Sequence, residues 1–234
     1  KLSCVDERLA VLTNNGNVCI FHDQTLLAQL DEPQKPLKQR TYHSFAWSPD
    51  GKFVILGNED SELVIFAINR AREGISFTYN SSIRLDHSST EWVIEIEWKR
   101  NIIAVSLSDN SAYVLNYENF QVQPEPHKIK KPSRFKITDV QVVNENVLLV
   151  TTGSLHRFNT KTGSASSVSL ESCDEFYIIP IESKNCAILL SNKTSCKINL
   201  NGEISLQPDD VVSPHIESKF KKWNTVFNEF NKYE

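Results

Sequence analysis

One unit recurs along this chain: a short apolar strand, a tight polar turn and a second strand rich in β-formers. Its clearest copy is YHSFAWSPDGKFVILGNEDSELVIF, from Tyr42 to Phe66, where two turn signals separate three apolar runs. At Ser48-Pro49-Asp50-Gly51, proline presets one turn dihedral and glycine tolerates positive φ. Short runs of β-formers between such turns predict an antiparallel meander and not a helix.

Five copies of this unit align on their central turns. They are LAVLTNNGNVCIF (9–21), FVILGNEDSELVIF (53–66), IIAVSLSDNSAYVL (102–115), NVLLVTTGSLHRF (146–158) and CAILLSNKTSCKI (186–198). The turn centres lie 44, 50, 44 and 40 residues apart. A period in the forties with about four strands per unit is typical of a WD40-type β-propeller. One blade cannot bury both of its faces, so neighbouring blades are expected to stack.

The repeat therefore predicts an all-β chain, a WD40-like β-propeller that forms part of a seven-bladed ring. The predicted blades cover residues 1–30, 41–87, 91–130, 135–171 and 175–207. The first blade shows strands only at Leu9–Leu12, Val18–Phe21 and Leu26–Leu30, so its opening strand is predicted to be missing. The outer strand of the second blade is expected near Ile75–Leu85.

Two features predict how the blades pack. The segment VIEIEW, residues 93–98, alternates Ile94, Ile96 and Trp98 against Val93 and two glutamates. This period of two indicates that one strand face packs on a neighbouring blade. The tryptophans at 47, 92 and 98 are expected on strands, as blade-packing residues and not as ligand platforms.

The C-terminal stretch departs from the repeat and predicts an amphipathic helix over about residues 216–232. Its apolar residues Ile216, Phe220, Trp223, Phe227 and Phe230 are spaced by 4, 3, 4 and 3 residues, which places them on one helical stripe. Such a stripe either packs on its own domain or contacts another chain. The four aromatic members of the stripe are the candidate partner-binding residues.

Composition excludes several classes of protein. No apolar run approaches the roughly 18 residues needed to span a bilayer, so no membrane association is expected. A net charge of −4 argues against a domain whose whole surface binds nucleic acid. The 5 cysteines form no CxxC pair, and they are expected as unpaired core residues in a reducing compartment.

Nothing in the sequence supports catalysis. The 6 histidines have no metal-ligand spacing, and the 7 glycines form no phosphate-binding loop. No GxSxG elbow is present. Asp139 and Glu145 are expected to be solvated carboxylates at strand ends. The chain is therefore predicted to have no enzyme activity, no metal, no cofactor and no small-molecule substrate.

A basic loop, residues 127–136, carries the strongest positive charge. The candidate phosphate contacts are Lys128, Lys130, Lys131, Arg134 and Lys136. Such a cluster could neutralise several phosphates through salt-sensitive contacts. It lacks the interleaved aromatic residues that stack on bases, so a solvated loop between blades is the alternative interpretation. Prolines at 124, 126 and 132 argue against a helix or a central strand here.

Seven phrases spread from Leu9 to Glu234 carry a family resemblance. They are LAVLTNNGNVCIF, RTYHSFAWSP, VILGNEDSEL, SSIRL, KITDV, AILLSNKTSCK and KFKKWNTVFNEFNKYE. The chain has no Trp-Asp dipeptide closing a blade and no Gly-His pair opening one, unlike common WD40 repeats. It resembles instead the divergent propellers of the sixty-kilodalton tau subunits of yeast transcription factor IIIC, the RNA polymerase III assembly factor.

This resemblance implies a nuclear, non-enzymatic scaffold. Members of that family join an N-terminal propeller to a separate C-terminal α/β domain, and only the propeller is expected within these 234 residues. They pair with a second WD40 propeller subunit in the part of the complex that engages the B-box promoter element. The family is also linked to recruitment of the TATA-binding protein. DNA association is then mainly indirect, through the other subunits of the complex.

Three functions therefore stay open at this point. The first is the interaction scaffold, and the second is a direct nucleic-acid-binding propeller that uses the basic loop 127–136. The third is an enzyme with an active site in the propeller channel, for which the sequence offers no converging polar residues.

Overall fold

The computed structural model describes most of the chain up to residue 208. The described residues are 2–5, 8–12, 18–22, 25–30, 41–71, 74–86, 90–118, 121–122, 126–129, 136–171, 176–181, 185–191, 195–201 and 204–208. They form strands and turns and contain no helix, and hence none long and apolar enough to cross a membrane. The predicted helix at 216–232 lies outside these residues.

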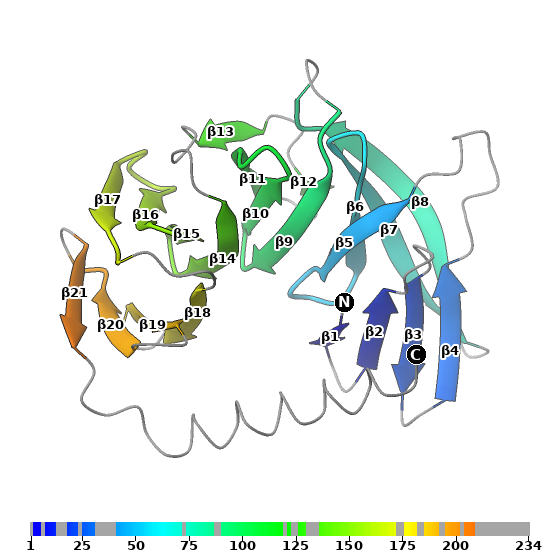
Figure 1. Cartoon of the computed structure of the whole chain (residues 1–234). Helices are drawn as coiled ribbons and strands as arrows, with labels where there is room; N and C mark the ends of the chain where they lie inside the picture. Colours follow the sequence, from blue (N-terminus) through cyan, green and yellow to red (C-terminus); the bar gives the residue numbers. More distant parts are fainter. Residues whose placement is uncertain are drawn as a thin grey trace, which may run out of the picture.

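The described strands form five antiparallel sheets, each built from strands that follow one another along the chain (Figure 1). The first sheet contains β1 (Leu2–Val5), β2 (Arg8–Leu12), β3 (Val18–His22) and β4 (Thr25–Leu30). The second contains β5 (Tyr42–Trp47), β6 (Phe53–Asn58), β7 (Glu62–Ala71) and β8 (Gly74–Arg84). The all-β prediction is confirmed for the part of the chain described here.

The remaining sheets repeat this order. The third contains β9 (Val93–Lys99), β10 (Ile102–Leu107), β11 (Ala112–Glu118), β12 (Gln121–Val122) and β13 (His127–Ile129). The fourth contains β14 (Ile137–Val143), β15 (Asn146–Thr151), β16 (Ser154–Asn159) and β17 (Ala165–Ser169). The fifth contains β18 (Phe176–Ile181), β19 (Cys186–Ser191), β20 (Ser195–Asn199) and β21 (Ser205–Pro208).

Two predictions about strands need correction. The opening strand of the first sheet is present, because Leu2–Val5 pairs antiparallel with β2. The stretch from Gln121 to Lys136 is also not entirely loop. Its segments β12 and β13 pair with the two ends of β11 and together act as the outer strand of the third sheet. Proline is tolerated on edge strands, which explains why the interruption between β12 and β13 occurs in the outer strand.

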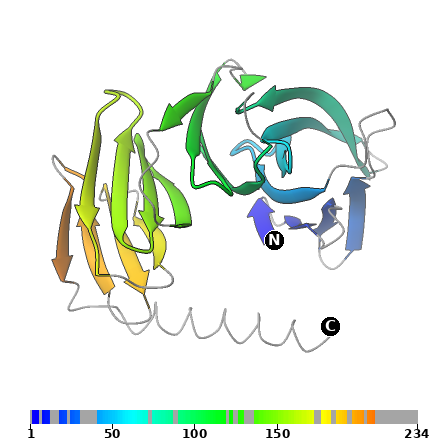
Figure 2. The same ribbon diagram turned by 45° about the horizontal axis from the view of Figure 1, so that its top comes forward.

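The core lies between the sheets, which follow one another along an arc (Figure 1). Each of four apolar clusters joins consecutive sheets. Leu12, Val18 and Ile20 of the first sheet pack with Phe45, Trp47 and Leu56 of the second. Ile65 of the second sheet packs with Ile96, Trp98 and Val105 of the third. The other two clusters join the third sheet to the fourth and the fourth to the fifth. Figure 2 shows the same succession of sheets from a second direction.

A β-bulge lies at the start of three first strands. The extra residue, which has no paired partner in the register, is His43 in β5, Ile94 in β9 and Thr138 in β14. One extra residue reverses the faces that follow it. For this reason Val93 shares the buried face of Ile96 and Trp98, whereas Ile94 is 47% exposed. The predicted alternation over residues 93–98 is therefore wrong at its first two positions.

The tryptophan predictions divide in the same way. Trp47 and Trp98 are buried on β5 and β9, where they pack between sheets as expected. Trp92 precedes β9, lies outside any strand and is 53% exposed, so its prediction as a packing residue is wrong.

Polar contacts join the second sheet to the third, the third to the fourth and the fourth to the fifth. The Ser44 hydroxyl donates to the carbonyl of Val93 at 3.0 Å, and the amide of Ile137 donates to Asn110 Oδ1 at 3.1 Å. The Ile178 amide donates to Asp139 Oδ2 at 2.6 Å. These contacts fix the register between sheets as well as within them.

Candidate partner-binding surface

The two surfaces predicted from the sequence lie mainly outside the described residues. Phe220, Trp223, Phe227 and Phe230 of the aromatic stripe lie outside them, as do Lys130, Lys131 and Arg134 of the basic loop. The stripe therefore stays a prediction. Lys128 and Lys136 are the members of the basic loop whose surroundings can be described.

Lys128 lies on β13 opposite Tyr113 of β11. Its ammonium is 3.0 Å from Asp86 Oδ2, and the Tyr113 hydroxyl donates to the same oxygen at 2.9 Å. The ammonium also lies 5.3 Å from the centre of the Tyr113 ring. Hydrogen bonding to the Tyr113 hydroxyl, followed by that to Asp86, raises the pKa of Lys128 above its ordinary value. The positive charge of Lys128 is therefore already compensated within the fold.

Lys136 is exposed just before β14, and its carbonyl accepts a hydrogen bond from the Thr152 amide at 3.2 Å. The exposed Lys136 stays a candidate phosphate contact. A phosphate-binding role for the whole loop stays a prediction.

A different surface comes from the structure: the exposed Trp92, the neighbouring Ile94 and the imidazole of His43. The Trp92 and His43 rings stack with their centres 4.6 Å apart and their planes 3° from parallel. His43 and Ile94 are the bulge residues of β5 and β9, so both side chains lie at the end of the sheets where these strands begin. We call these three residues the Trp92 patch.

Hydrogen bonds hold the backbone of the Trp92 patch from both sides. The Glu91 amide donates to the Ser61 hydroxyl oxygen at 2.9 Å, and the Ser61 amide donates to the Glu91 carbonyl at 2.8 Å. The Trp92 amide donates to Ser108 Oγ at 3.0 Å, and the Ser108 amide donates to the Trp92 carbonyl at 2.9 Å. The backbone that carries the exposed indole is therefore already ordered in this structure.

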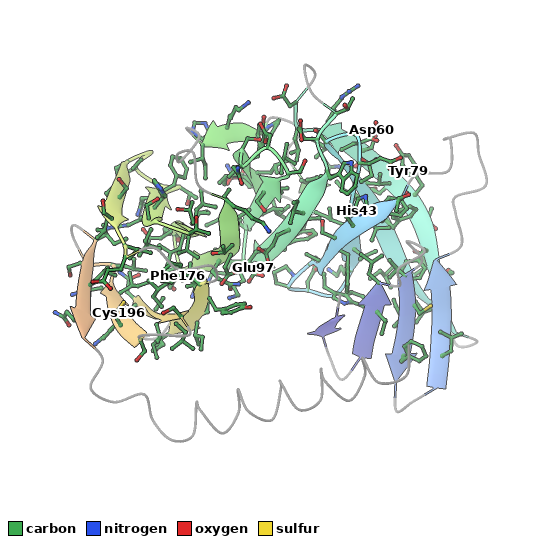
Figure 3. All side chains as sticks on the ribbon, viewed as in Figure 1. His43, Asp60, Tyr79, Glu97, Phe176 and Cys196 are labelled. Carbon is green, nitrogen blue, oxygen red and sulfur yellow. The ribbon has the colours of Figure 1, made fainter. Side chains whose placement is uncertain are left out.

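Acidic residues lie close to the Trp92 patch along the chain. Glu91 Oε2 accepts the Ser108 hydroxyl at 2.5 Å. The turn that contains Ser61 also brings Glu59 and Asp60 to this end of the second sheet, where Figure 3 labels both His43 and Asp60. Glu95 follows Ile94 on β9.

Sequence reasoning missed the Trp92 patch because a bulge inserts one residue and leaves no signature in the alternation of apolar residues. His43 and Ser44 interrupt the apolar residues at the head of β5, but two polar residues do not by themselves identify a bulge.

Two further polar groups, the carboxylate of Asp139 and the hydroxyl of Ser154, have surroundings that the structure defines. Asp139 is buried and not the solvated strand-end carboxylate that was expected, and burial raises its pKa. Ser154 Oγ lies 2.7 Å from His156 Nε2 and 2.8 Å from Thr151 Oγ1. The Ser154 amide also donates to Thr151 Oγ1, so this hydroxyl cluster stabilises the β15–β16 turn.

Among the described residues, no group of three or more His, Cys, Asp or Glu side chains could hold a metal ion. Cys19, Cys186 and Cys196 form no disulfide bonds.

Comparisons with known proteins give the same fold and one high-identity relative. No protein-family model matches the chain. The transcription factor tau 60 kDa subunit of Saccharomyces cerevisiae is 41% identical over 238 residues, which cover 100% of this chain and 40% of that protein. The guanine nucleotide-binding protein negative regulator 1 of Schizosaccharomyces pombe is 25% identical over 211 residues, covering 75% of this chain and 51% of that protein.

Two of the solved structures that match are a β-propeller domain and a WD40 domain. The Swd1 β-propeller domain of Myceliophteria thermophila aligns with a TM-score of 0.61 at 16% identity, over 88% of this chain and 69% of that one. The WD40 domain of SCAP from fission yeast aligns with a TM-score of 0.57 at 17% identity, over 89% and 52% of the two chains. These identities support the fold alone, which is that of WD40 β-propellers.

Proposed function

Because this chain is homologous along its whole length to the 60 kDa subunit of yeast transcription factor tau, we propose that it is a non-enzymatic scaffold in RNA polymerase III transcription factor IIIC. The observation that carries this proposal is the 41% identity over the full chain. The chain spans 40% of that relative, so the partners of the whole protein are part of the proposal.

We further propose that the five sheets belong to a seven-bladed ring in the nucleus. The partners would be a second WD40 propeller subunit, the other subunits of the complex and the TATA-binding protein. DNA would then be reached mainly through the part of the complex that binds the B-box element. Stacked sheets whose polar contacts run from one blade to the next support a rigid platform of this kind.

The alternative, direct binding of nucleic acid, rests on the basic loop 127–136. Lys128 is paired with Asp86, so this alternative depends on Lys130, Lys131, Arg134 and Lys136. An interaction that uses several such contacts weakens steeply with salt.

The deciding experiment purifies the full-length protein with its partners from nuclear extract, at moderate and at high salt, and identifies them by mass spectrometry. A scaffold retains a second propeller subunit and other factor IIIC subunits at high salt. Nuclease treatment of a parallel sample serves as the control for bridging by nucleic acid. Recovery of the protein alone, or only with nucleic acid that salt removes, would refute the scaffold.

A further inference from the structure

We propose that Asn201 is a site of spontaneous chemical modification, at which the side-chain amide is lost and the residue becomes aspartate or isoaspartate. The modification acts on the polar contacts that join the fourth sheet to the fifth. This inference goes beyond the scaffold function proposed above and does not depend on it.

The first observation is the pair formed by Asn201 and the glycine that follows it. The sequence contains two Asn-Gly pairs, Asn15-Gly16 and Asn201-Gly202, and Asn201 is the asparagine of the two that lies within the described residues. Glycine has no Cβ, so its backbone nitrogen is little shielded and its φ and ψ vary freely. Both properties help this nitrogen to approach the side chain of the preceding asparagine.

The reaction needs no partner other than water. The backbone nitrogen of Gly202 forms a bond to Cγ of Asn201, and the bond from Cγ to Nδ2 breaks. The Nδ2 group takes up the proton that the backbone nitrogen loses and leaves as ammonia. Water then opens the resulting cyclic imide at either carbonyl. The product is aspartate, or isoaspartate when the main chain continues through the side-chain carbonyl.

The second observation is the exposure and hydrogen bonding of the Asn201 side chain. Asn201 is exposed, so water reaches it. Asn185 Nδ2 donates to Asn201 Oδ1 at 2.9 Å. A donor on this oxygen stabilises the negative charge that develops there when Cγ is attacked. The amide of Asn201 donates to Asn199 Oδ1 at 3.0 Å, which orders the backbone just after β20.

The third observation is that Asn201 ends a chain of three asparagine amides that crosses from the fourth sheet to the fifth. Asn144, in the turn between β14 and β15, donates through Nδ2 to Asn185 Oδ1 at 3.2 Å. Asn185, just before β19, donates in turn to Asn201. The Leu200 amide also donates to the Asn185 carbonyl at 3.3 Å. A change at Asn201 therefore reaches the contact between these two sheets.

The two products differ in their effect on this chain of amides. Aspartate keeps a side-chain oxygen that accepts a hydrogen bond from Asn185, and its main chain is unchanged. Isoaspartate lengthens the main chain by a methylene group and moves the carboxylate. The pairing of β20 with β21 lies next to this position, with Asn199 opposite Ser205. Isoaspartate therefore loosens β21, whereas aspartate leaves it paired.

The test uses the full-length protein in its assembled complex, incubated at physiological pH and temperature. Peptide mapping by mass spectrometry measures amide loss at each asparagine. An isoaspartyl methyltransferase with radioactive S-adenosylmethionine labels isoaspartate. We expect Asn201 to lose its amide severalfold faster than Asn185 and Asn199, which are followed by cysteine and leucine in the same sheet.

Two variants check the chemistry. Gly202→Ala should slow amide loss at position 201 severalfold, because the added Cβ hinders the approach of the backbone nitrogen. Asn201→Gln keeps a side-chain amide but requires a larger ring, so it should remove the methyltransferase labelling at this position. A sample of the natural protein unfolded in urea gives the rate of amide loss without the hydrogen bond from Asn185.

Hydrogen exchange then measures the effect on the fold. The isoaspartate form is separated from the unmodified protein by ion exchange, and the two are compared. We expect faster exchange in β21 of the isoaspartate form and unchanged exchange in β10, which belongs to the third sheet. Asn201→Asp adds the charge without the extra methylene, so its β21 should exchange as in the unmodified protein.

Several results would overturn the inference. They are amide loss at Asn201 that is no faster than at Asn185 and Asn199, amide loss that occurs only in urea, and an unchanged rate in Gly202→Ala. Equal exchange of β21 in the isoaspartate and unmodified forms would refute the effect on the fifth sheet. Co-purification with other subunits is a separate measurement, so these results leave the scaffold proposal untouched.

Discussion

Asp139 of β14 has its carboxylate buried between the fourth and fifth sheets. It accepts hydrogen bonds from the Ile178 amide at 2.6 Å and from the Gln141 side chain at 3.1 Å. Burial raises the pKa of Asp139, and the hydrogen bonds from Ile178 and Gln141 oppose this rise only in part. One oxygen of Asp139 therefore accepts a hydrogen bond from the backbone of the next sheet, while burial disfavours the negative charge of the carboxylate.

Replacement of Asp139 should reveal both roles. Asp139→Ala leaves the Ile178 amide without its partner and should lower the free energy of unfolding by about 1–3 kcal/mol. Asp139→Asn keeps one acceptor oxygen for Ile178 and can pair with a rotated Gln141 amide, so it should cost much less. The measurement is urea unfolding of both variants. Equal losses in the two would contradict the assigned hydrogen bond.

The sign of the pH dependence follows from the raised pKa of Asp139. A carboxyl whose pKa is higher in the folded than in the unfolded protein stabilises the fold while protonated, below about pH 4. That contribution is lost as the pH rises through the folded pKa. The stability of Asp139→Asn relative to the natural protein should therefore increase from about pH 4 upward. A difference that stays constant with pH would show that the carboxyl is not buried.

At the scale of single elements, the first strands approach their neighbours very closely. A Cβ added at Gly57 of β6 would lie 2.3 Å from Val93 Cγ1, 2.6 Å from Val93 Cβ and 2.7 Å from Ser44 Oγ. Val93 Cβ is attached to the β9 backbone, so relief of this contact requires movement of the third sheet. The glycine is therefore needed for packing between sheets.

Gly57→Ala should lower the free energy of unfolding by about 1–3 kcal/mol, as expected for overpacking between rigid strands. Combining it with Val93→Ala removes the Cγ1 contact, so the two losses should sum to more than the loss in the double variant. Urea unfolding of the two single variants and the double variant tests this. If the losses of the two single variants simply added up to that of the double variant, the strain would not come from the contact between positions 57 and 93.

The strand pattern could be predicted wherever local chemistry controls the structure. The SPDG turn is an example, because Gly51 adopts a φ of 64° and its amide donates to the Ser48 carbonyl at 2.9 Å. The bulges could not be predicted, since a single extra residue changes which face is buried without changing composition. The Trp92 patch depends on two of these bulges. It also depends on contacts between Ser61 and Glu91 that span 30 residues, so no local pattern reveals it.

At the scale of the whole molecule, the second, third and fourth sheets are more buried in their middle strands than in their outer strands. All six residues of β10 and of β15 are buried. Residues of β8 and β17 alternate between exposed and partly buried along most of their length. Stability is therefore expected to be unevenly distributed within these three sheets.

Hydrogen exchange measured by mass spectrometry should follow this gradient. We expect amides of β10 and β15 to exchange slowest, and those of β8 and β17 to exchange faster by about tenfold or more, because outer strands open locally without disturbing the core. Peptides from β6 and β16 serve as internal references in the same two sheets as β8 and β17. Equal protection of β8 and β10 would indicate that the sheets open only as a unit.

The contacts that join the sheets have a direction. In each of them a side chain of the earlier sheet is bonded to a backbone group of the later sheet. Ser44 is bonded to the carbonyl of Val93, Asn110 to the amide of Ile137, and Asp139 to the amide of Ile178. A ribosome completes the earlier sheet first. During translation, the second, third and fourth sheets are therefore each made before the sheet that supplies this contact. Synthesis from the N-terminus thus presents the blades in the order in which these three contacts can form.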